Sequence, residues 1–315
     1  MDRPAIINAL DISVLGKSLV SAFLKLNEKL WKAFPLWMTS LGPVRAYGNW
    51  LHAIACMRSN RQFYFGTFFF RNRPQLELAR RISDQMRKQS GLNISVLACS
   101  IGAEVYSIVW TLRSGQPDLK MALNAVDISK EALEFGENGV YPLGGGGLTD
   151  EKIFARVTSQ EKLELFHDEE DRLRIRPWLG EGIDWRIGDA AAPQLADLLG
   201  PQDMVFANNF LCHMHARDAE RCLRNVVKLV KPGGYLFVSG IDLDVRTRVV
   251  RDFMLKPVTD LIEEIHNGDP SLLKDWPFRY WGLEPLDLRR HDWKIRYSSV
   301  FRTPPEPAMR GRSAM

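Results

Sequence analysis

The stretch that most constrains the fold of this chain is residues 94–108, ISVLACSIGAEVYSI, because a short apolar strand leads through a turn of small residues directly into a helix. Gly102 can adopt backbone angles that other residues avoid. The small side chains of Ala98, Ser100 and Ala103 let a ligand lie close to the main chain and to the first turn of the helix. A strand, turn and helix of this kind predict a nucleotide-cofactor site.

A second apolar strand is expected at residues 121–126, MALNAV, and it ends in Asp127, 25 residues after Gly102. An acid at the tip of the second strand is placed to accept hydrogen bonds from the two hydroxyls of a ribose. This outline alone also fits an NAD-binding oxidoreductase.

The glycine count argues against a dinucleotide. A dinucleotide site uses three glycines to bring the helix start to the pyrophosphate, whereas this turn has Gly102 alone, followed by Glu104 in the first helical turn. A carboxylate at that position would repel a pyrophosphate and attract a cofactor that carries positive charge. S-adenosylmethionine, with its ammonium and sulfonium groups, is such a cofactor, and NAD is the most distant alternative.

The same residues carry a family resemblance. ACSIGAEVYSI, residues 98–108, resembles the ACSTGEEPYSIA signature of the chemotaxis receptor methyltransferases, the CheR family. Five further segments resemble family motifs in the same order: TFFFR at 67–71, AVDI at 125–128, NGVY at 138–141, FANNFLCH at 206–213 and LVKPGG at 229–234. Their joint occurrence is far more specific than any one of them.

The resemblance implies an α/β class I methyltransferase fold, Rossmann-like, with a mainly parallel sheet and a small helical N-terminal region. It also implies S-adenosylmethionine as the cofactor, with Thr67 bonded to it, Glu104 facing its positive methionine end and Asp127 holding the ribose. The full cofactor site that we expect comprises Thr67, Arg71, Ala98, Gly102, Glu104, Asp127, Ile128, Asp189, Asn208 and Asn209.

Two residues are candidates for the reaction itself. Arg71 falls where the family has an arginine at the cofactor and acceptor carboxylates, and a guanidinium can bind a carboxylate through two parallel hydrogen bonds. His213 falls where the family has a tyrosine beside the methyl-transfer site, and it would be the base for a phenol or alcohol acceptor. A carboxylate acceptor, with a reference pKa of about 4, is already an anion at neutral pH and needs no base.

Each of these residues also has a structural interpretation that the sequence leaves open. Arg71 could be a surface arginine whose stem covers apolar neighbours, and His213 a strand-end histidine held by local hydrogen bonds. Glu104 could be a helix-start charge and Asp127 a turn cap.

Departures from the family lie on the acceptor side. The family's HSEN after the fifth parallel strand reads GIDL at 240–243, the tyrosine reads His213, and the hairpin expected within 160–178 has a shorter, acidic turn than the hairpin that docks a receptor tail in some members. Aromatic residues also gather at 268–294. We therefore expect a small organic acceptor with a carboxylate or hydroxyl, in a largely apolar pocket. A chemoreceptor glutamate and a non-catalytic cofactor-binding regulator are the alternatives.

The chain divides into three expected regions. Residues 1–65 form a helical N-terminal region, 66–302 the methyltransferase domain with a cap at 243–294, and 303–315 a disordered tail. The N-terminal region includes an amphipathic helix at 13–33, which either packs onto a neighbour or binds a membrane surface or partner helix. Its apolar stripe is Leu15, Leu19, Phe23, Leu26 and Leu30. The expected strands are 94–98, 121–126, 183–187, 203–208, 234–239 and 295–301.

Composition excludes several other classes. A net charge of +4, from 42 basic and 38 acidic residues, gives no case for nucleic-acid binding. Four cysteines make neither a zinc pattern nor a disulfide framework, so we expect no metal and a cytoplasmic location. We expect no transmembrane segment, because no uncharged apolar run of about 18 residues occurs.

Overall fold

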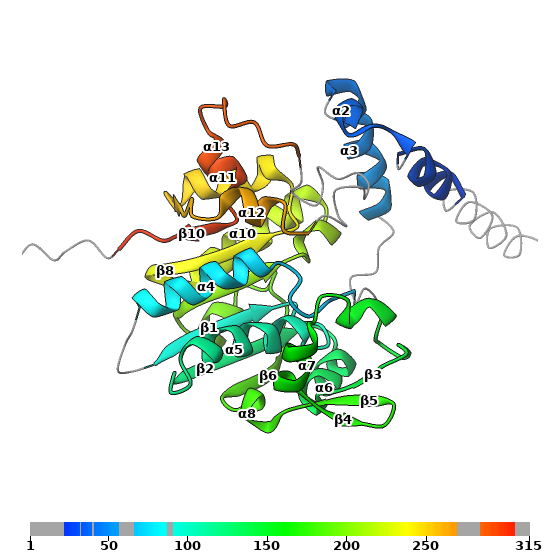
Figure 1. Cartoon of the computed structure of the whole chain (residues 1–315). Coiled ribbons are helices and arrows are strands. Elements are labelled where there is room, and N and C mark those ends of the chain that lie inside the picture. Colours follow the sequence, from blue (N-terminus) through cyan, green and yellow to red (C-terminus); the bar gives the residue numbers. More distant parts are fainter. Residues whose placement is uncertain are drawn as a thin grey trace, which may run out of the picture.

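The computed structural model describes residues 22–31, 33–39, 41–56, 66–86, 91–269 and 284–305. Its centre is a seven-stranded sheet with the strand order β6-β2-β1-β7-β8-β10-β9 (Figure 1). The five strands from β6 to β8 are parallel, whereas β10 runs antiparallel to β8 and β9 antiparallel to β10. In chain order the strands are β1 (Leu92–Leu97), β2 (Met121–Asp127), β6 (Ile183–Ile187), β7 (Gln202–Asn208), β8 (Val230–Ser239), β9 (Lys256–Pro257) and β10 (Val300–Arg302).

The strand order reverses beside β1, and this reversal locates the ligand site. The chain runs outward from β1 through β2 to β6, and then returns to place β7 and β8 on the other side of β1. In open parallel sheets, ligands bind outside the carboxyl ends of the strands at such a switch point. The expected mainly parallel α/β sheet is confirmed, and the residues that follow β1, β2, β6 and β7 all reach this edge.

Helices cover both faces of the sheet, as the alternating strand residues require. On β7, Met204 and Phe206 belong to one apolar core, while Val205 and Ala207 belong to the core on the opposite face. The first core includes α4 (Arg73–Gln85), α5 (Ala103–Gly115) and α6 (Lys130–Asn138). The second includes α9 (Leu195–Leu199), α10 (Ala216–Leu229) and α11 (Leu243–Asp252).

A small antiparallel sheet packs beside the first core. Its strand order is β3-β5-β4, and the expected hairpin within 160–178 is the β4–β5 pair. Between residues 140 and 180 the elements are the strands β3 (Val140–Pro142), β4 (Phe166–Glu169) and β5 (Arg172–Ile175), with the helices η1 (Glu151–Phe154), α7 (Ser159–Leu165) and α8 (Pro177–Gly180). Phe69, the middle residue of the TFFFR motif, packs against Tyr141, Phe154 and Phe166. This aromatic cluster fixes the start of the domain against the small sheet.

The expected strand at 295–301 is wrong in its first part. Residues 293–297 form the helix α13 (Trp293–Tyr297), and only Val300–Arg302 form a strand. Ile295, Tyr297 and Phe301 recur at even spacing, which imitates a strand. A helix forms here instead of a strand because it lets Tyr297 pack against Leu243 and Ile262. It also lets the buried Arg296 pair with Glu284 and Asp244.

The C-terminal part is more broken than expected. Within the expected cap at 243–294, residues 243–266 form α11, the short edge strand β9 and α12 (Ile262–His266). Most of the aromatic segment, residues 270–283, lies outside the described residues, and Trp293 packs with Leu286 in a small apolar cluster. The cap at 243–294 therefore stays a prediction.

The described part of the N-terminal region is helical. Residues 22–31, α2 (Leu36–Thr39) and α3 (Gly42–Cys56) form its helices, and Figure 1 shows α2 and α3 away from the sheet. At the other end, Thr303 is buried and its main-chain N–H donates to the Gly234 carbonyl oxygen, while residues 306–315 lie outside the described ones. Among the described helices, none is long and apolar enough to cross a membrane.

Candidate functional site

One cleft at the carboxyl ends of the parallel strands brings together ten of the eleven residues predicted from the sequence. The space between its walls is about 920 Å³, including the part open to solvent. The ten residues are Thr67, Arg71, Ala98, Glu104, Asp127, Ile128, Asp189, Asn208, Asn209 and His213.

The turn between β1 and α5 is held in an uncommon backbone conformation. Ala98 and Ser100 have φ angles of 53° and 51°, the left-handed region that side-chain-bearing residues rarely adopt. The turn is fixed to the end of β2, because Cys99 donates its N–H to the Val126 carbonyl oxygen at 3.0 Å. Such strain persists only where the surroundings hold it, and it gathers at ligand sites.

Gly102 is the one predicted residue that does not line the cleft. Its φ of 84° needs glycine, and a Cβ atom there would lie 2.7 Å from the Trp185 ring. The structure thus accounts for this glycine through its backbone angle and through helix packing against Trp185. It begins α5 as the N-cap residue.

Asp127 joins two loops at the cleft. One carboxylate oxygen accepts the N–H of Ser100 at 2.8 Å, and the other accepts the N–H of Ser129 at 2.9 Å. Burial raises the pKa of Asp127, and these backbone hydrogen bonds oppose the rise. Asp127 therefore does cap the turn, as one interpretation of the sequence expected. Each of its carboxylate oxygens also has a second lone pair, which can accept a hydrogen bond from a ligand.

Glu104 presents a second carboxylate to the cleft. Its Oε1 accepts a hydrogen bond from Asn208 Nδ2 at 2.7 Å, and it forms no ion pair with any Lys, Arg or His that the structure describes. Burial raises the pKa of Glu104, whereas the Asn208 hydrogen bond and the charge of Arg71 lower it. A half-buried carboxylate with a neutral partner is a receptive place for a cation.

Arg71 lies in the wall of the cleft, not on the open surface. Its Nε donates to Asp269 at 3.1 Å, its Nη1 donates to the Gly66 carbonyl oxygen at 3.4 Å, and its guanidinium lies over the Phe68 ring. Arg156 donates to the other oxygen of Asp269. These contacts position Arg71 and leave Nη2 without a hydrogen bond among the described residues.

His213 ends a short helix, η2 (Leu211–His213), after β7. Burial, assisted by the positive charge of Arg71, lowers the pKa of His213 to about 4. The imidazole is therefore neutral at pH 7 and is a weak base. A rising limb near pH 6.5, which an unperturbed histidine base would give, is not expected from this residue.

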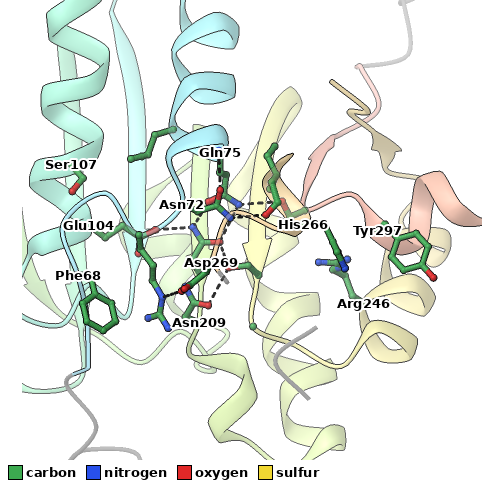
Figure 2. A pocket seen from close by; sticks show the side chains of 17 residues that line it. Phe68, Asn72, Gln75, Glu104, Ser107, Asn209, Arg246, His266, Asp269 and Tyr297 are labelled. Carbon is green, nitrogen blue, oxygen red and sulfur yellow. Dashed lines mark hydrogen bonds and ion pairs between the residues drawn. The ribbon is translucent and has the colours of Figure 1, made fainter. Parts of the chain in front are cut away.

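A second cavity adjoins the cleft and shares Arg71, Glu104, Asn208 and Asn209 with it. Figure 2 shows Gln75 in the middle of the view, Glu104 to one side of it, and Arg246 and Tyr297 on the opposite side, among the C-terminal elements.

A hydrogen-bonded chain fixes the wall that the two cavities share. Asn208 Nδ2 also donates to Gln75 Oε1 at 2.8 Å, and Ser239 Oγ donates to Asn208 Oδ1 at 2.9 Å. Asn208 therefore orients Glu104 and is itself oriented by two further residues.

Sequence reasoning missed Gln75, Ser239, Arg246 and Tyr297 on this second wall. One usable signal exists for Gln75, because it occupies an inward position of α4 together with Leu78 and Ile82. A polar residue on an apolar stripe needs a buried partner. Within the cleft, Phe210 and Met214 were also missed.

Comparison with known proteins places the chain in a family. Residues 66–243 match the family described as CheR methyltransferase, SAM binding domain. The chain belongs to the CheR methyltransferase family. The resemblance inferred from the motifs is thus confirmed, the sheet is that of a class I methyltransferase, and the cofactor of this domain is S-adenosylmethionine.

The chain is also similar to three curated relatives. Chemotaxis protein methyltransferase Cher2 of Pseudomonas putida is 29% identical over 185 residues, which cover 55% of this chain and 64% of the relative. Chemotaxis protein methyltransferase of Escherichia coli is 28% identical over 61% of this chain and 64% of its own length. Probable biofilm formation methyltransferase WspC of Pseudomonas putida is 25% identical over 55% of this chain and 40% of its own. The chain thus spans less than two thirds of each of these relatives.

Proposed function

We propose that the chain is an S-adenosylmethionine-dependent O-methyltransferase that forms a methyl ester on a carboxylate. The observation that carries this proposal is the Glu104 carboxylate, which faces the cleft with Asn208 as its hydrogen-bond partner and no ion pair among the described residues. A carboxylate removed from water is stabilised by an opposite charge. The ammonium group of the cofactor would supply that charge.

The cofactor would lie along the cleft with its adenosine toward β2 and β6. Asp127 ends β2 and Asp189 lies shortly after β6, so they would contact the ribose and the base. The methionine end would then lie at Glu104, near Asn208 and Asn209, where the cleft meets the second cavity. In this orientation the methyl group faces Arg71.

A carboxylate suits the reaction because it needs no base. In an in-line displacement, a carboxylate oxygen forms a bond to the methyl carbon while the carbon–sulfur bond breaks, and no proton moves. His213, with its pKa lowered to about 4, would be a poor base for a phenol or alcohol. Arg71 Nη2 is placed to bind the acceptor carboxylate and hold it in line.

The relatives favour a protein carboxylate as the acceptor, because two of the three named above are chemotaxis protein methyltransferases. The expectation of a small molecule rested partly on the aromatic segment, and Trp293 of that segment packs into an apolar cluster. We therefore place a glutamate side chain of a chemoreceptor first.

A small organic acid is the second candidate, and one observation favours it. The second cavity, about 740 Å³ including open space, joins the cleft at Arg71 and contains the buried Arg246. The anionic group of a small acceptor would be attracted to these two arginines.

The experiment supplies S-adenosylmethionine with a tritiated methyl group, together with either a chemoreceptor cytoplasmic fragment or panels of carboxylic acids and phenols. Methyl esters release volatile methanol in alkali, whereas methyl ethers do not. We expect alkali-labile label on the receptor fragment. Label on a carboxylic acid alone would select the second candidate, and alkali-stable label on a phenol would contradict ester formation. Calorimetric binding of S-adenosylmethionine without transfer to any acceptor would indicate a non-catalytic regulator.

A further inference from the structure

The N-terminal helices expose an unusual number of large apolar side chains. Eight of the fourteen large hydrophobic residues exposed among the described ones fall between Phe23 and Trp50, and the other six are spread between Leu143 and Leu288. Leu26 is 59% exposed, Trp37 66% and Trp50 52%. Soluble proteins rarely gather such residues without a function for them.

These helices are nevertheless packed on their inner side. Asn27 and Trp31 on residues 22–31 are buried, as is Leu51 on α3. The Tyr47 hydroxyl donates to Asn27 Oδ1 at 2.6 Å, which links the two helices. The exposed apolar residues are therefore an outer surface of a packed helical unit.

The outer surface of residues 22–31 has the pattern of an interfacial helix. Phe23, Leu26 and Leu30 follow at steps of three and four, so they form one stripe. Lys25 and Lys29 are exposed and, by helical geometry, flank that stripe on the side away from Asn27 and Trp31. Apolar and aromatic residues bordered by lysines are typical of helices that lie in the surface of a bilayer.

The charge of the region identifies the kind of bilayer. Residues 12–65 contain seven Lys or Arg and one acid, Glu28, whereas the whole chain is nearly balanced. Such a region is attracted to anionic headgroups, and each Lys or Arg near the surface adds to the attraction. The same charge repels a second copy of the region, which disfavours self-association through this surface.

We propose that the N-terminal helices bind the surface of an anionic lipid bilayer through the interfacial patch, defined by Phe23, Leu26, Leu30, Trp37, Tyr47 and Trp50. The apolar side chains enter the boundary between headgroups and acyl chains, and Lys25 and Lys29 contact the anionic headgroups. Tryptophan and tyrosine favour this boundary because one end of each ring system is apolar and the other polar. This inference goes beyond the proposed catalytic function and does not depend on it.

The test is co-sedimentation of the full chain with vesicles of phosphatidylcholine alone or mixed with phosphatidylserine. Binding is expected with phosphatidylserine, and it should weaken as salt is raised. Leu26→Ala/Leu30→Ala should lower the partition coefficient at least about tenfold through lost apolar burial. The matched control Leu163→Ala/Leu198→Ala removes two equally exposed leucines, 61% and 55%, from other helices and should bind like the wild type.

A second pair of matched variants tests the contribution of the lysine charges to vesicle binding. Lys25→Glu/Lys29→Glu should reduce binding at least about tenfold, whereas Lys130→Glu/Lys152→Glu makes the same net change elsewhere and should have a much smaller effect. All of these side chains are exposed, so the fold should tolerate the changes.

Three results would overturn the proposal. The first is no sedimentation with either vesicle, and the second is equal loss in the patch variants and their controls. The third is dimerisation of the wild type in analytical ultracentrifugation that Leu26→Ala/Leu30→Ala abolishes without any change in vesicle binding. That result would assign the surface to a second copy of the chain. Methyl transfer is measured in none of these assays, so the proposed function stands or falls separately.

Discussion

The cleft and the second cavity meet at the same four residues, yet their remaining walls are built differently. The cleft wall comes from short runs at or directly after strand ends, at 98–100 after β1, 127–128 at the end of β2 and 188–190 after β6. The wall of the second cavity comes from one or two residues on each of several elements, among them α4, α11 and α12. In the proposed arrangement the strand ends would hold the cofactor, whereas the acceptor would contact the wall of the second cavity, which is built from helices that can vary independently.

The largest effect that tests this division concerns Arg71, which lines both cavities. Arg71→Lys keeps the charge and removes the planar fork, so turnover should fall on the order of 100-fold while S-adenosylhomocysteine binding changes much less. Rates and calorimetry on the same preparation measure both quantities.

Arg156 provides the matched control for Arg71. It also donates to Asp269 and lies over Phe68, but it lines neither cavity. Arg156→Lys should reduce turnover only a few-fold. Equal losses in the two variants would make Arg71 a structural partner of Asp269 and not a contributor to the reaction.

The next largest effect concerns cofactor binding by the cleft wall. Asp127→Ala should weaken S-adenosylhomocysteine binding by about 1–3 kcal/mol, because hydrogen bonds to the ribose and to Ser100 are both lost. Tyr297→Phe in the second cavity should leave the affinity unchanged. A titration in which Tyr297→Phe weakens the cofactor as much as Asp127→Ala would erase the distinction between the two walls.

The wall of the cleft could be predicted from the sequence better than the wall of the second cavity, because the two walls are built differently. Asp127 and Asn208 end strands that have clear apolar patterns, so their position at one sheet edge could be inferred. Arg246 and Tyr297 approach the cavity only because α11 and α13 pack together, and no local pattern records that packing. The strand expected at 295–301 failed for this reason, since its alternating pattern is locally convincing and is overridden by buried ion pairs.

A smaller effect concerns the pH dependence of Glu104, at the junction of the two cavities. Its pKa is raised by burial, and the cofactor ammonium favours the ionised carboxylate. Affinity for S-adenosylmethionine should therefore fall as pH drops through this raised pKa. Glu104→Gln should bind about tenfold more weakly, with an affinity that no longer changes over that range.

The free energy of unfolding of the unliganded protein should depend on the Glu104 pKa in the opposite direction to cofactor affinity: it should rise as pH falls. Because the folded state holds the proton more tightly than the unfolded state, the free energy of unfolding contributed by this group rises as pH falls from the raised pKa toward the ordinary glutamate value of about 4.3. Chemical denaturation at several pH values, with Glu104→Gln as reference, measures it. Parallel slopes in the two proteins would show that the Glu104 pKa is not raised.

The smallest effect concerns His213. Since its pKa is lowered to about 4, the imidazole is uncharged near pH 7. His213→Ala should therefore change the rate with a carboxylate acceptor only a few-fold and leave the pH–rate profile flat near pH 6.5. A wild-type limb near pH 6.5 that disappears in His213→Ala would make this residue a base, and would restore a phenol or alcohol acceptor.

The most direct test of the whole account is a crystal structure of the chain with S-adenosylhomocysteine bound. The account predicts the homocysteine amino group at Glu104, the ribose at Asp127, and the sulfur facing Arg71 at the junction of the cleft and the second cavity. A ligand bound in the reverse direction, or outside the cleft, would contradict the proposed positions of the cofactor and of methyl transfer.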